Sequence, residues 1–174
     1  MRARHPDRWL MTDERQGEAL WRALGRLPRG GGIVFRHHAT PPAERARLFA
    51  RVAAVARRRG LILVRAGATP LRGERGRHAR RGPGLVTWPA HSRPEAIMAV
   101  RAGAALVFVS PVFATRSHPG ARALGPLRAA AIARGLPLGA IALGGVDERR
   151  YRHRLRALGF GGYAAIDAWG AGDG

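Results

Sequence analysis

Short apolar runs alternate with segments of helical periodicity along the whole chain, and this alternation restricts the fold more than any other feature. Residues 61–64 and 105–109 are continuous apolar runs, as is typical of strands buried on both faces. Alternating strands and helices of this kind indicate a parallel sheet covered by helices. We expect strands at residues 8–12, 32–36, 61–64, 84–88, 105–109, 140–143 and 162–166, with room for a further short strand at 77–79.

Start and stop signals mark the helices between these strands. Pro41 and Pro42 suit the first turn of a helix, and Gly60 stands where the end of a helix favours glycine. Ser92, with Glu95 three positions later, has the spacing of a capping box. With the apolar spacing, these signals predict helices at residues 16–26, 43–59, 92–102, 124–134 and 147–158.

Eight strand candidates within 174 residues favour an α/β fold, a compact (β/α)8 TIM barrel that forms a single domain over residues 1–174. Residues 66–83 are too few, and too rich in Gly, Pro and Arg, to hold a full helix beside a strand. Few residues follow the last expected strand, so the barrel is expected to lack a full final helix. An open, doubly wound sheet is the structural alternative.

The composition excludes several kinds of chemistry. The chain has no cysteine, which removes disulfides, thiolate nucleophiles and cysteine-bound metal centres. It has no lysine, so all 31 basic residues are arginine, and Schiff-base chemistry and a P-loop lysine are excluded. No apolar run reaches the roughly 20 residues that a membrane span needs, and the first residues do not resemble a signal peptide. We therefore expect a cytoplasmic protein.

The formal net charge of +20 has two readings. Binding to nucleic acid or another anion is the functional one. The other is a genomic codon bias, because Arg, Ala, Gly and Pro dominate where Lys, Asn and Ile are scarce. The arginines are spread over every segment, and no helix-turn-helix, zinc-finger or RNA-binding signature accompanies them. We favour codon bias and keep nucleic-acid binding as an alternative.

Several motifs follow the expected strands in an order that resembles one known family. The strongest is residues 110–118, Ser-Pro-Val-Phe-Ala-Thr-Arg-Ser-His, followed by Gly125, where the family pattern is Gly-Pro-Val-Phe-x-Thr-x-Thr/Ser-Lys and then Gly. Supporting matches are residues 9–13, 34–38, 91–96, 102–104, 142–146 and 162–167. From Trp9 to Ala168 the chain resembles the thiamine phosphate synthase family.

The resemblance implies an activity, two substrates and a cofactor. Members of this family join an aminopyrimidine pyrophosphate to a thiazole phosphate, which forms thiamine phosphate and releases pyrophosphate. They use Mg²⁺. We therefore expect the pyrimidine pyrophosphate and the thiazole phosphate as the partners of this chain. A related branch of the family isomerises the thiazole phosphate instead.

By this resemblance, the pyrophosphate side of the site lies at the end of the second strand. Arg36 matches the family's pyrophosphate-contacting arginine, and guanidinium suits bidentate phosphate binding. His38 replaces a lysine, and it faces the same way as Arg36 because side chains alternate along a strand. We expect His37, between them, to face outward into solvent.

The phosphate side is expected at the turn after the seventh strand. Backbone N–H groups at Gly144 and Gly145, between a strand and a helix, can cradle a phosphate. The resemblance adds the hydroxyl groups of Thr115 and Ser117 and the backbone of Ile166 and Asp167. Where Asp167 stands the family usually has serine, and a carboxylate repels phosphate.

Histidines are the candidates for acid–base catalysis. His118 replaces a family lysine, and His91 follows the fifth strand. A single histidine is more often a surface or capping residue, so catalysis is the less favoured reading for each. His78 lies in the uncertain stretch and receives less weight still.

The Mg²⁺ site is the main departure from the family. The family places an Asn-Asp pair after the third strand and another carboxylate after the fourth, where this chain has Arg65 and residues 77–81. Mg²⁺ prefers hard oxygen ligands, usually one or two carboxylates, and Arg65 would repel it. Only Asp13 and Asp167 are expected at this end of the barrel, and neither matches a family ligand. Mg²⁺ is thus expected from the family, but its ligands are missing.

Two outcomes are compatible with this departure. Arg36, Arg65 and Arg80 could neutralise the leaving pyrophosphate without a metal. Alternatively, the pyrimidine site is lost, which leaves a thiazole-phosphate isomerase or a non-catalytic barrel that binds a phosphorylated ligand. The catalytic histidine of the isomerase branch falls at Pro111, so residue matching does not support that activity. A divergent thiamine phosphate synthase is the leading prediction.

Overall fold

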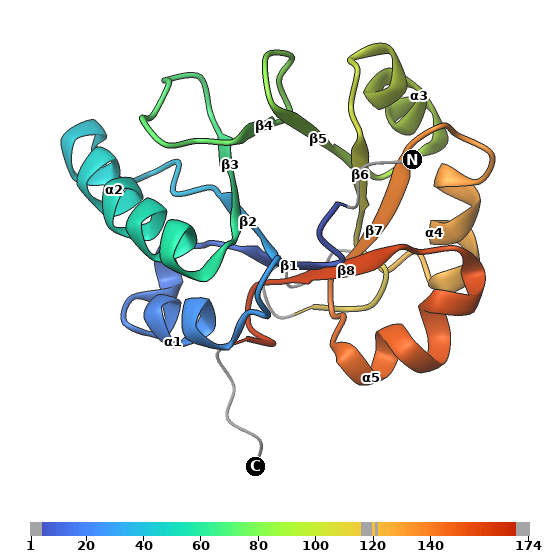
Figure 1. The fold of residues 1–174 in the computed structure, drawn as a ribbon. Coiled ribbons are helices and arrows are strands. Elements are labelled where there is room, and N and C mark those ends of the chain that lie inside the picture. Colours follow the sequence, from blue (N-terminus) through green and yellow to red (C-terminus); the bar gives the residue numbers. More distant parts are fainter. Residues whose placement is uncertain (1–4, 116–119, 121, 170–174) are drawn as a thin grey trace.

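The apolar runs form parallel strands that pair in sequence order and close into a barrel, as the computed structural model shows (Figure 1). The structure describes residues 5–115, 120 and 122–169. The strands are β1 (Arg8–Met11), β2 (Gly32–Phe35), β3 (Ile62–Ala66), β4 (Gly76–His78), β5 (Leu85–Ala90), β6 (Leu106–Val109), β7 (Gly139–Leu143) and β8 (Gly162–Ala165). Leu10 of β1 lies opposite both Ile33 of β2 and Ala165 of β8. The barrel is therefore closed, as predicted, and the open sheet is excluded.

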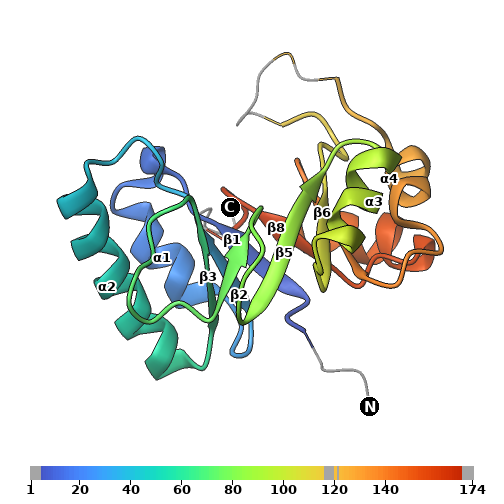
Figure 2. The same ribbon diagram turned by 90° about the horizontal axis from the view of Figure 1, so that it is seen from above.

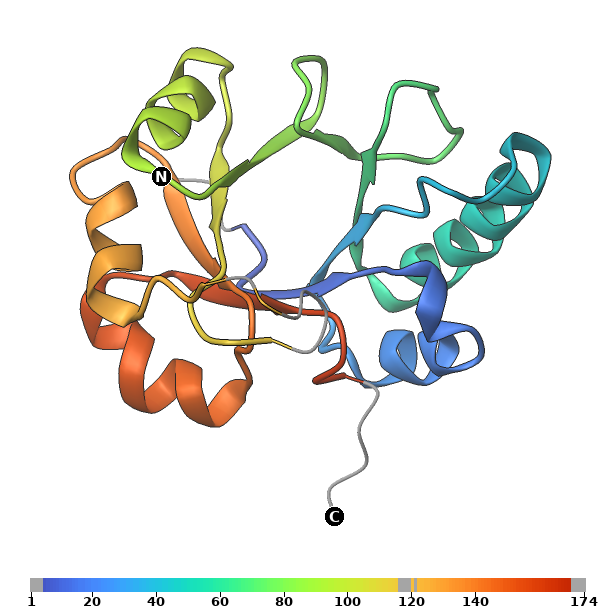
Figure 3. The ribbon, with the colours of Figure 1, turned by 180° about the vertical axis from the view of Figure 1, so that it is seen from behind.

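Helices cover the outside of the barrel unevenly. One half carries α1 (Ala19–Arg26) and α2 (Pro42–Arg59), and the other carries α3 (Arg93–Arg101), α4 (Pro126–Ala133) and the short α5 (Glu148–Arg150) (Figures 2 and 3). Loops alone connect β3 to β4 and β4 to β5, as the shortage of residues at 66–83 predicts. Among the described residues, no helix is long and apolar enough to cross a membrane.

Two expected helices are interrupted where the backbone leaves α-helical geometry. In place of one helix at residues 16–26, a 3-10 turn (Glu14–Gln16) and Gly17 at φ +47° precede α1. After α5, the chain continues as a π-helical turn (Tyr151–Leu155) and a 3-10 turn (Arg156–Leu158). Apolar spacing does not separate these geometries over one or two turns, because their periods are similar.

Alternation along the strands sorts the apolar side chains into two layers. Inward-facing residues such as Trp9, Val34 and Phe108 fill the barrel, and outward-facing residues such as Leu10 pack under the helices. Trp9 meets Phe108 edge-on, with 5.2 Å between the ring centroids. A β-carbon at Gly32 would overlap the Trp9 ring, so this glycine makes room for the tryptophan. Because side chains fill the interior, polar groups gather at the ends of the strands.

An aromatic side chain covers the outer face of β8. Trp169 stacks on Tyr163, with ring centroids 5.4 Å apart, and its Nε1 donates to the carbonyl oxygen of Trp9 at 2.9 Å. The guanidinium carbon of Arg8 lies 5.1 Å from the centre of the Tyr163 ring, and Arg8 Nε donates to Glu148 at 2.7 Å. These contacts hold β1, β8 and α5 together where the barrel closes.

Replacing Trp169 with alanine is expected to lower the free energy of unfolding by about 3 kcal/mol, because a buried indole and its hydrogen bond are lost. Trp169→Phe keeps the stacking on Tyr163 and should cost about 1 kcal/mol. Urea denaturation measures both values. Leu127→Ala, at a side chain that is 71% exposed, is the control. A Trp169→Ala protein as stable as this control would contradict the assigned role.

Candidate functional site

Because all the strands are parallel, their carboxyl ends lie at one end of the barrel. We call this end, with the loops that follow the strands, the mouth. Asp13 follows β1, Arg36 follows β2, Gly144 follows β7 and Ile166 follows β8. The topology thus brings most of the residues predicted to bind phosphate groups to the same end of the molecule.

Arg36 is held at the mouth by one edge of its guanidinium group. Its Nε donates to the carbonyl oxygen of Thr12 at 2.9 Å, and its Nη2 donates to Asp13 Oδ2 at 3.1 Å. Burial lowers the pKa of Arg36, and the nearby charge of Asp13 acts in the opposite direction. Among the described residues, Nη1 of Arg36 donates no hydrogen bond, so this atom is open to an anion.

The turn after β1 connects the end of β8 to the end of β2. Arg15 donates from Nε to Asp13 Oδ1 at 2.7 Å, and this bond is the main cause that lowers the pKa of Asp13 to about 2. Gln16 accepts a hydrogen bond from the Asp13 backbone at 2.9 Å and donates to the carbonyl oxygen of Ile166 at 2.8 Å. Asp13 is therefore a fixed anion that orients Arg36.

His37 is buried, which corrects the prediction that it faces solvent. Its ring stacks on Phe35 with 4.6 Å between centroids, and its Nδ1 lies 2.9 Å from Thr12 Oγ1. Burial lowers the pKa of His37. The prediction was wrong because the outward face of β2 is covered by helix α2 rather than by water.

Two further histidines lie close enough to Arg36 to be affected by its charge. His38 is exposed in the loop after β2, and its pKa is lowered by burial and by the charges of Arg45 and Arg36. His78 is buried inside the barrel on β4, with Nδ1 2.9 Å from Thr87 Oγ1. Burial, with the charges of Arg36 and His38, lowers the pKa of His78 to about 4. His78 is therefore neutral at pH 7.

The turn after β7 is pressed against the loop after β6. Gly144 and Gly145 have φ angles of +92° and +61°. A β-carbon at Gly144 would lie 2.8 Å from Pro111 Cα, and the Phe113 backbone donates to the Gly144 carbonyl oxygen at 3.0 Å. Within the described part of the chain, the N–H groups of Gly144 and Gly145 donate no hydrogen bond. Glycine is thus required here, and its N–H groups are available.

The other residues predicted to contact the thiazole phosphate follow β6 and β8 in the chain. Thr115 is half-buried in the β6 loop, and Ser117 and His118 lie outside the described residues. Asp167 is exposed after β8 and is close enough to Arg15 for their charges to interact. Arg15 therefore offsets part of the negative charge of Asp167.

Arg65 faces the outside of the barrel rather than its interior. It is buried on the outer face of β3, where it pairs with Glu74 and donates to the carbonyl oxygen of Gly67. Burial is the largest single effect on Glu74 and raises its pKa, but the hydrogen bonds from Arg65 and from the Leu71 backbone, with the charges of Arg65 and Arg77, together lower the net pKa. Arg65 is thus neutralised by a protein carboxylate in the layer outside the barrel.

His91 belongs to the start of α3. Its backbone N–H and its Nδ1 both lie 2.9 Å from Glu95 Oε2, and its side chain is 58% exposed. Ser92 Oγ accepts a hydrogen bond from the Glu95 backbone, as predicted for a helix cap. The Glu95 carboxylate, however, accepts from the His91 backbone and the Ser92 hydroxyl group, so the capping box is not formed in its usual way.

Arg45 was not among the predicted site residues. Its Nε donates to the carbonyl oxygen of His37 at 2.8 Å, and its Nη2 donates to that of Ala66 at 2.6 Å. It is buried on the face of α2 that carries Phe49 and Val52. The signal in the sequence is its position: Arg45 stands in the first turns of a helix, at a place where the helical spacing expects an apolar, core-facing residue.

In the described part of the chain, the carboxylates Asp13 and Glu74 are poorly suited to bind Mg²⁺. Among the described residues, no three His, Asp or Glu side chains are grouped as metal ligands. Asp13 is paired with Arg15 and Arg36, and Glu74 is paired with Arg65. A carboxylate already bound by arginine is a poor ligand, because the cation must leave before the metal can bind.

Sequence comparison gives one clear match. A family model described as thiamine monophosphate synthase matches residues 67–169. No curated protein matches the chain. The matched segment covers the strands from β4 to β8 and includes the Gly144–Gly145 turn.

Solved structures share the barrel. Thiamine phosphate pyrophosphorylase from Pyrococcus furiosus aligns with a TM-score of 0.79 and 20% identity, over 96% of this chain and 89% of that chain. A structure described as native KDPGal gives a TM-score of 0.61 at 14% identity, over 94% and 84% of the two chains. The YdjI aldolase from Escherichia coli K12 gives 0.58 at 11% identity, over 93% and 75%. At these identities the likeness establishes the fold alone.

Replacing Asp13 with asparagine is expected to destabilise the protein by about 1–2 kcal/mol at pH 6. The pKa of Asp13 is lowered from 3.8 to about 2, so its contribution is complete above 3.8 and is lost as the pH falls through about 2. Urea denaturation of both proteins should therefore give a difference that shrinks between pH 6 and pH 2.5. Asp7→Asn, at a side chain that is 64% exposed, is the control. A difference that does not change with pH would contradict the assigned charge interaction.

Gly144→Ala is expected to destabilise the protein by about 1–3 kcal/mol, because the backbone has a positive φ and the new β-carbon would press on Pro111. Thermal or urea unfolding measures this cost. The matched control is Gly25→Ala in α1, where a β-carbon would meet no atom within 4 Å. That change should be neutral or stabilising. Equal effects of the two substitutions would contradict the described turn.

Proposed function

The chain belongs to the thiamine monophosphate synthase family, and from this membership we propose that it joins an aminopyrimidine pyrophosphate to a thiazole phosphate in the cytoplasm. The products are thiamine phosphate and pyrophosphate. In this reaction the thiazole nitrogen attacks the methylene carbon that carries the pyrophosphate group. The new C–N bond forms as the C–O bond breaks, and pyrophosphate leaves with the electron pair.

The thiazole phosphate is proposed to bind at the turn after β7. The N–H groups of Gly144 and Gly145, which donate no hydrogen bond to any described residue, support this assignment, because adjacent backbone amides at a strand–helix turn hold phosphate oxygens well. Thr115 and Ser117 would add hydroxyl groups from the β6 loop, and the backbone of Ile166 and Asp167 would complete the site. His118, outside the described residues, is proposed as a catalytic residue from the family resemblance alone.

The leaving pyrophosphate is proposed to lie against Arg36 and His38. Negative charge accumulates on the pyrophosphate oxygens as the C–O bond breaks, so a fixed cation beside them lowers the barrier. Arg36 is already oriented by Thr12 and Asp13 and needs little rearrangement to act on this charge. Arg65 has no part in this proposal, because Glu74 neutralises it outside the barrel. His91 also has no part in this proposal, because it contacts Glu95 at the start of α3.

One observation carries the proposal. Nη1 of the anchored Arg36 and the N–H groups of Gly144 and Gly145 lie at the same mouth, and within the described part of the chain none of them donates a hydrogen bond. The reaction needs two separate anion sites that face one reacting centre, and this arrangement supplies the groups for both.

The absence of a fitting Mg²⁺ ligand set among the described residues favours a second candidate. In this alternative the barrel binds thiazole phosphate, or another small phosphorylated molecule, and does not carry out the coupling. Saturable binding of thiazole phosphate without product distinguishes it from the synthase.

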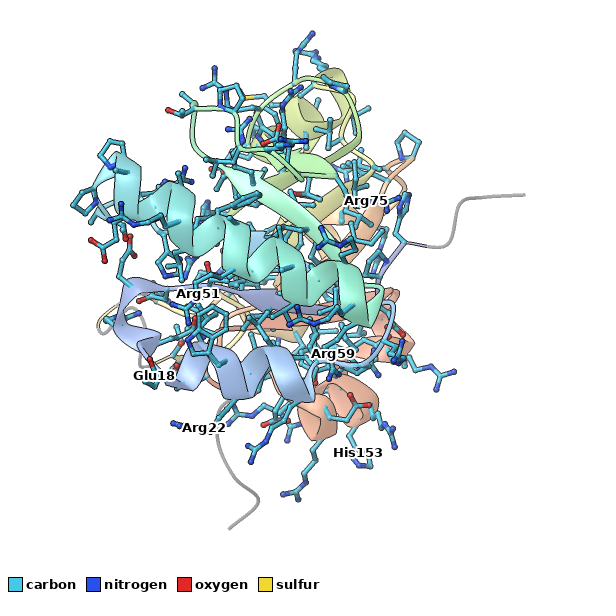
Figure 4. The ribbon with its side chains drawn as sticks, turned by 60° about the vertical axis from the view of Figure 1, so that its left-hand side comes forward. Glu18, Arg22, Arg51, Arg59, Arg75 and His153 are labelled. Atoms are coloured by element: carbon cyan, nitrogen blue, oxygen red, sulfur yellow. The ribbon has the colours of Figure 1, made fainter. Side chains whose placement is uncertain are left out.

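The synthase is tested by incubating the protein with both substrates and measuring thiamine phosphate by chromatography, with Mg²⁺ and with a chelator. We expect product, and Arg36→Gln should lower kcat about 100-fold or more because the transition state loses a fixed cation. Arg36→Lys should recover part of this loss. Arg22→Gln, on the outer face of α1 (Figure 4), is the charge-matched control. No product under either condition would overturn the proposal.

A further inference from the structure

A second arginine at the mouth is anchored in the same way as Arg36. In both side chains the edge formed by Nε and Nη2 is bonded to the protein: Arg36 to Thr12 and Asp13, and Arg45 to the carbonyl oxygens of His37 and Ala66. Among the described residues, neither Nη1 donates a hydrogen bond. Two guanidinium groups are therefore fixed by the protein, each with one nitrogen left for a ligand.

His38 lies close to Arg45 and within reach of the charge of Arg36. A β-carbon at Gly67 would lie 3.4 Å from Arg45 Nη2 and 3.7 Å from His38 Nδ1, so both side chains reach the same side of the loop after β3. The charges of Arg45 and of Arg36 both act on His38. Arg36 and His38 follow β2, and Arg45 from α2 bonds to the ends of both β2 and β3; we call these three residues the β2–β3 cluster.

The carboxylates near the β2–β3 cluster only partly balance it. Among the described residues, Arg45 has no Asp or Glu within ion-pair distance, and its bonded partners are neutral carbonyl groups. Asp13 pairs with Arg36, but it is also bound by Arg15. Glu14 accepts a hydrogen bond from the Ala39 backbone at 2.8 Å and acts on the cluster only through its longer-range charge. A buried cation without a counterion favours an anionic ligand.

The place where the family would hold Mg²⁺ is occupied differently in this chain. Arg65 and Glu74 pair with each other outside the barrel, and Arg45 reaches the end of β3 at Ala66 instead of a metal ligand. We infer that the β2–β3 cluster binds the pyrophosphate group directly, through Arg36, His38 and Arg45, without a bridging divalent cation. The inference rests on the proposed function for the identity of the anion.

Arg45 also joins the ends of β2 and β3, so a purely structural role has to be separated from binding. A structural arginine predicts that Arg45→Met lowers stability and that the remaining folded protein binds pyrophosphate as before. A binding arginine predicts weaker binding by the folded variant. His38 is exposed in a loop, so His38→Ala tests the same cluster with little risk to folding.

The experiment is a calorimetric titration of the purified full chain with inorganic pyrophosphate, in a chelator and again with Mg²⁺ in excess of pyrophosphate. We expect saturable binding in the chelator, and equal or weaker binding with Mg²⁺, because the metal competes with the arginines for the anion. Arg36→Gln, Arg45→Met and His38→Ala should each weaken binding at least about tenfold. Arg22→Gln, which makes the same charge change on the outer face of α1, should leave the affinity within about twofold.

Binding that requires Mg²⁺, or that is unchanged in both Arg45→Met and His38→Ala, would overturn the inference. The titration measures pyrophosphate binding and does not depend on catalysis, so the inference and the proposed function can fail separately. Metal-free binding of pyrophosphate without formation of thiamine phosphate supports the cluster and removes the proposed synthase. Thiamine phosphate formed only with Mg²⁺, together with Mg²⁺-dependent pyrophosphate binding, supports the synthase and removes the metal-free cluster.

Discussion

The pairing of β1 with β8 is the constraint on which the rest of the structure depends. It closes a sheet of parallel strands, so residues from opposite ends of the sequence lie side by side at one mouth. Gln16 bonds to Ile166 across this seam, and the same turn places Asp13 against Arg36. On the outside, Trp169 covers the seam and bonds to β1. Without closure, the glycine turn after β7 and the arginines after β2 would have no common reacting centre.

Periodicity predicts the barrel because burial repeats with the geometry of each element. Continuous apolar runs such as residues 105–109 identify strands that are covered on both faces, and the shortage of residues at 66–83 correctly predicts a segment without a helix. The type of helical turn is harder to predict from the spacing of apolar residues. The 3-10 turn before α1 contains no apolar residue, and the π turn after α5 keeps Tyr151 and Leu155 four positions apart, a spacing that an α-helix also has.

The candidate site is harder to predict, because the sequence does not say which pairs of charges meet. Arg36 could be predicted from its place at the end of a strand, but its partner Asp13 comes from the preceding turn. Arg65 stands in a similar place on β3, yet it faces outward and is paired with Glu74. The prediction for His37 was wrong because it assumed that solvent, rather than α2, covers the outward face of β2. Arginines are also frequent on the outer helices, for example Arg22, Arg51 and Arg59 (Figure 4). The number of arginines in the sequence therefore does not identify the few that lie at the mouth.

The central claim is that two anion sites share the mouth, one at the β7 turn and one at the β2–β3 cluster. A crystal structure of the protein with thiamine phosphate and pyrophosphate, grown in a chelator, tests it most directly. The account predicts the phosphate of thiamine phosphate on the amides of Gly144 and Gly145, and pyrophosphate against Arg36 and Arg45. Density for either anion at another part of the surface, with the mouth occupied only by water, would contradict it.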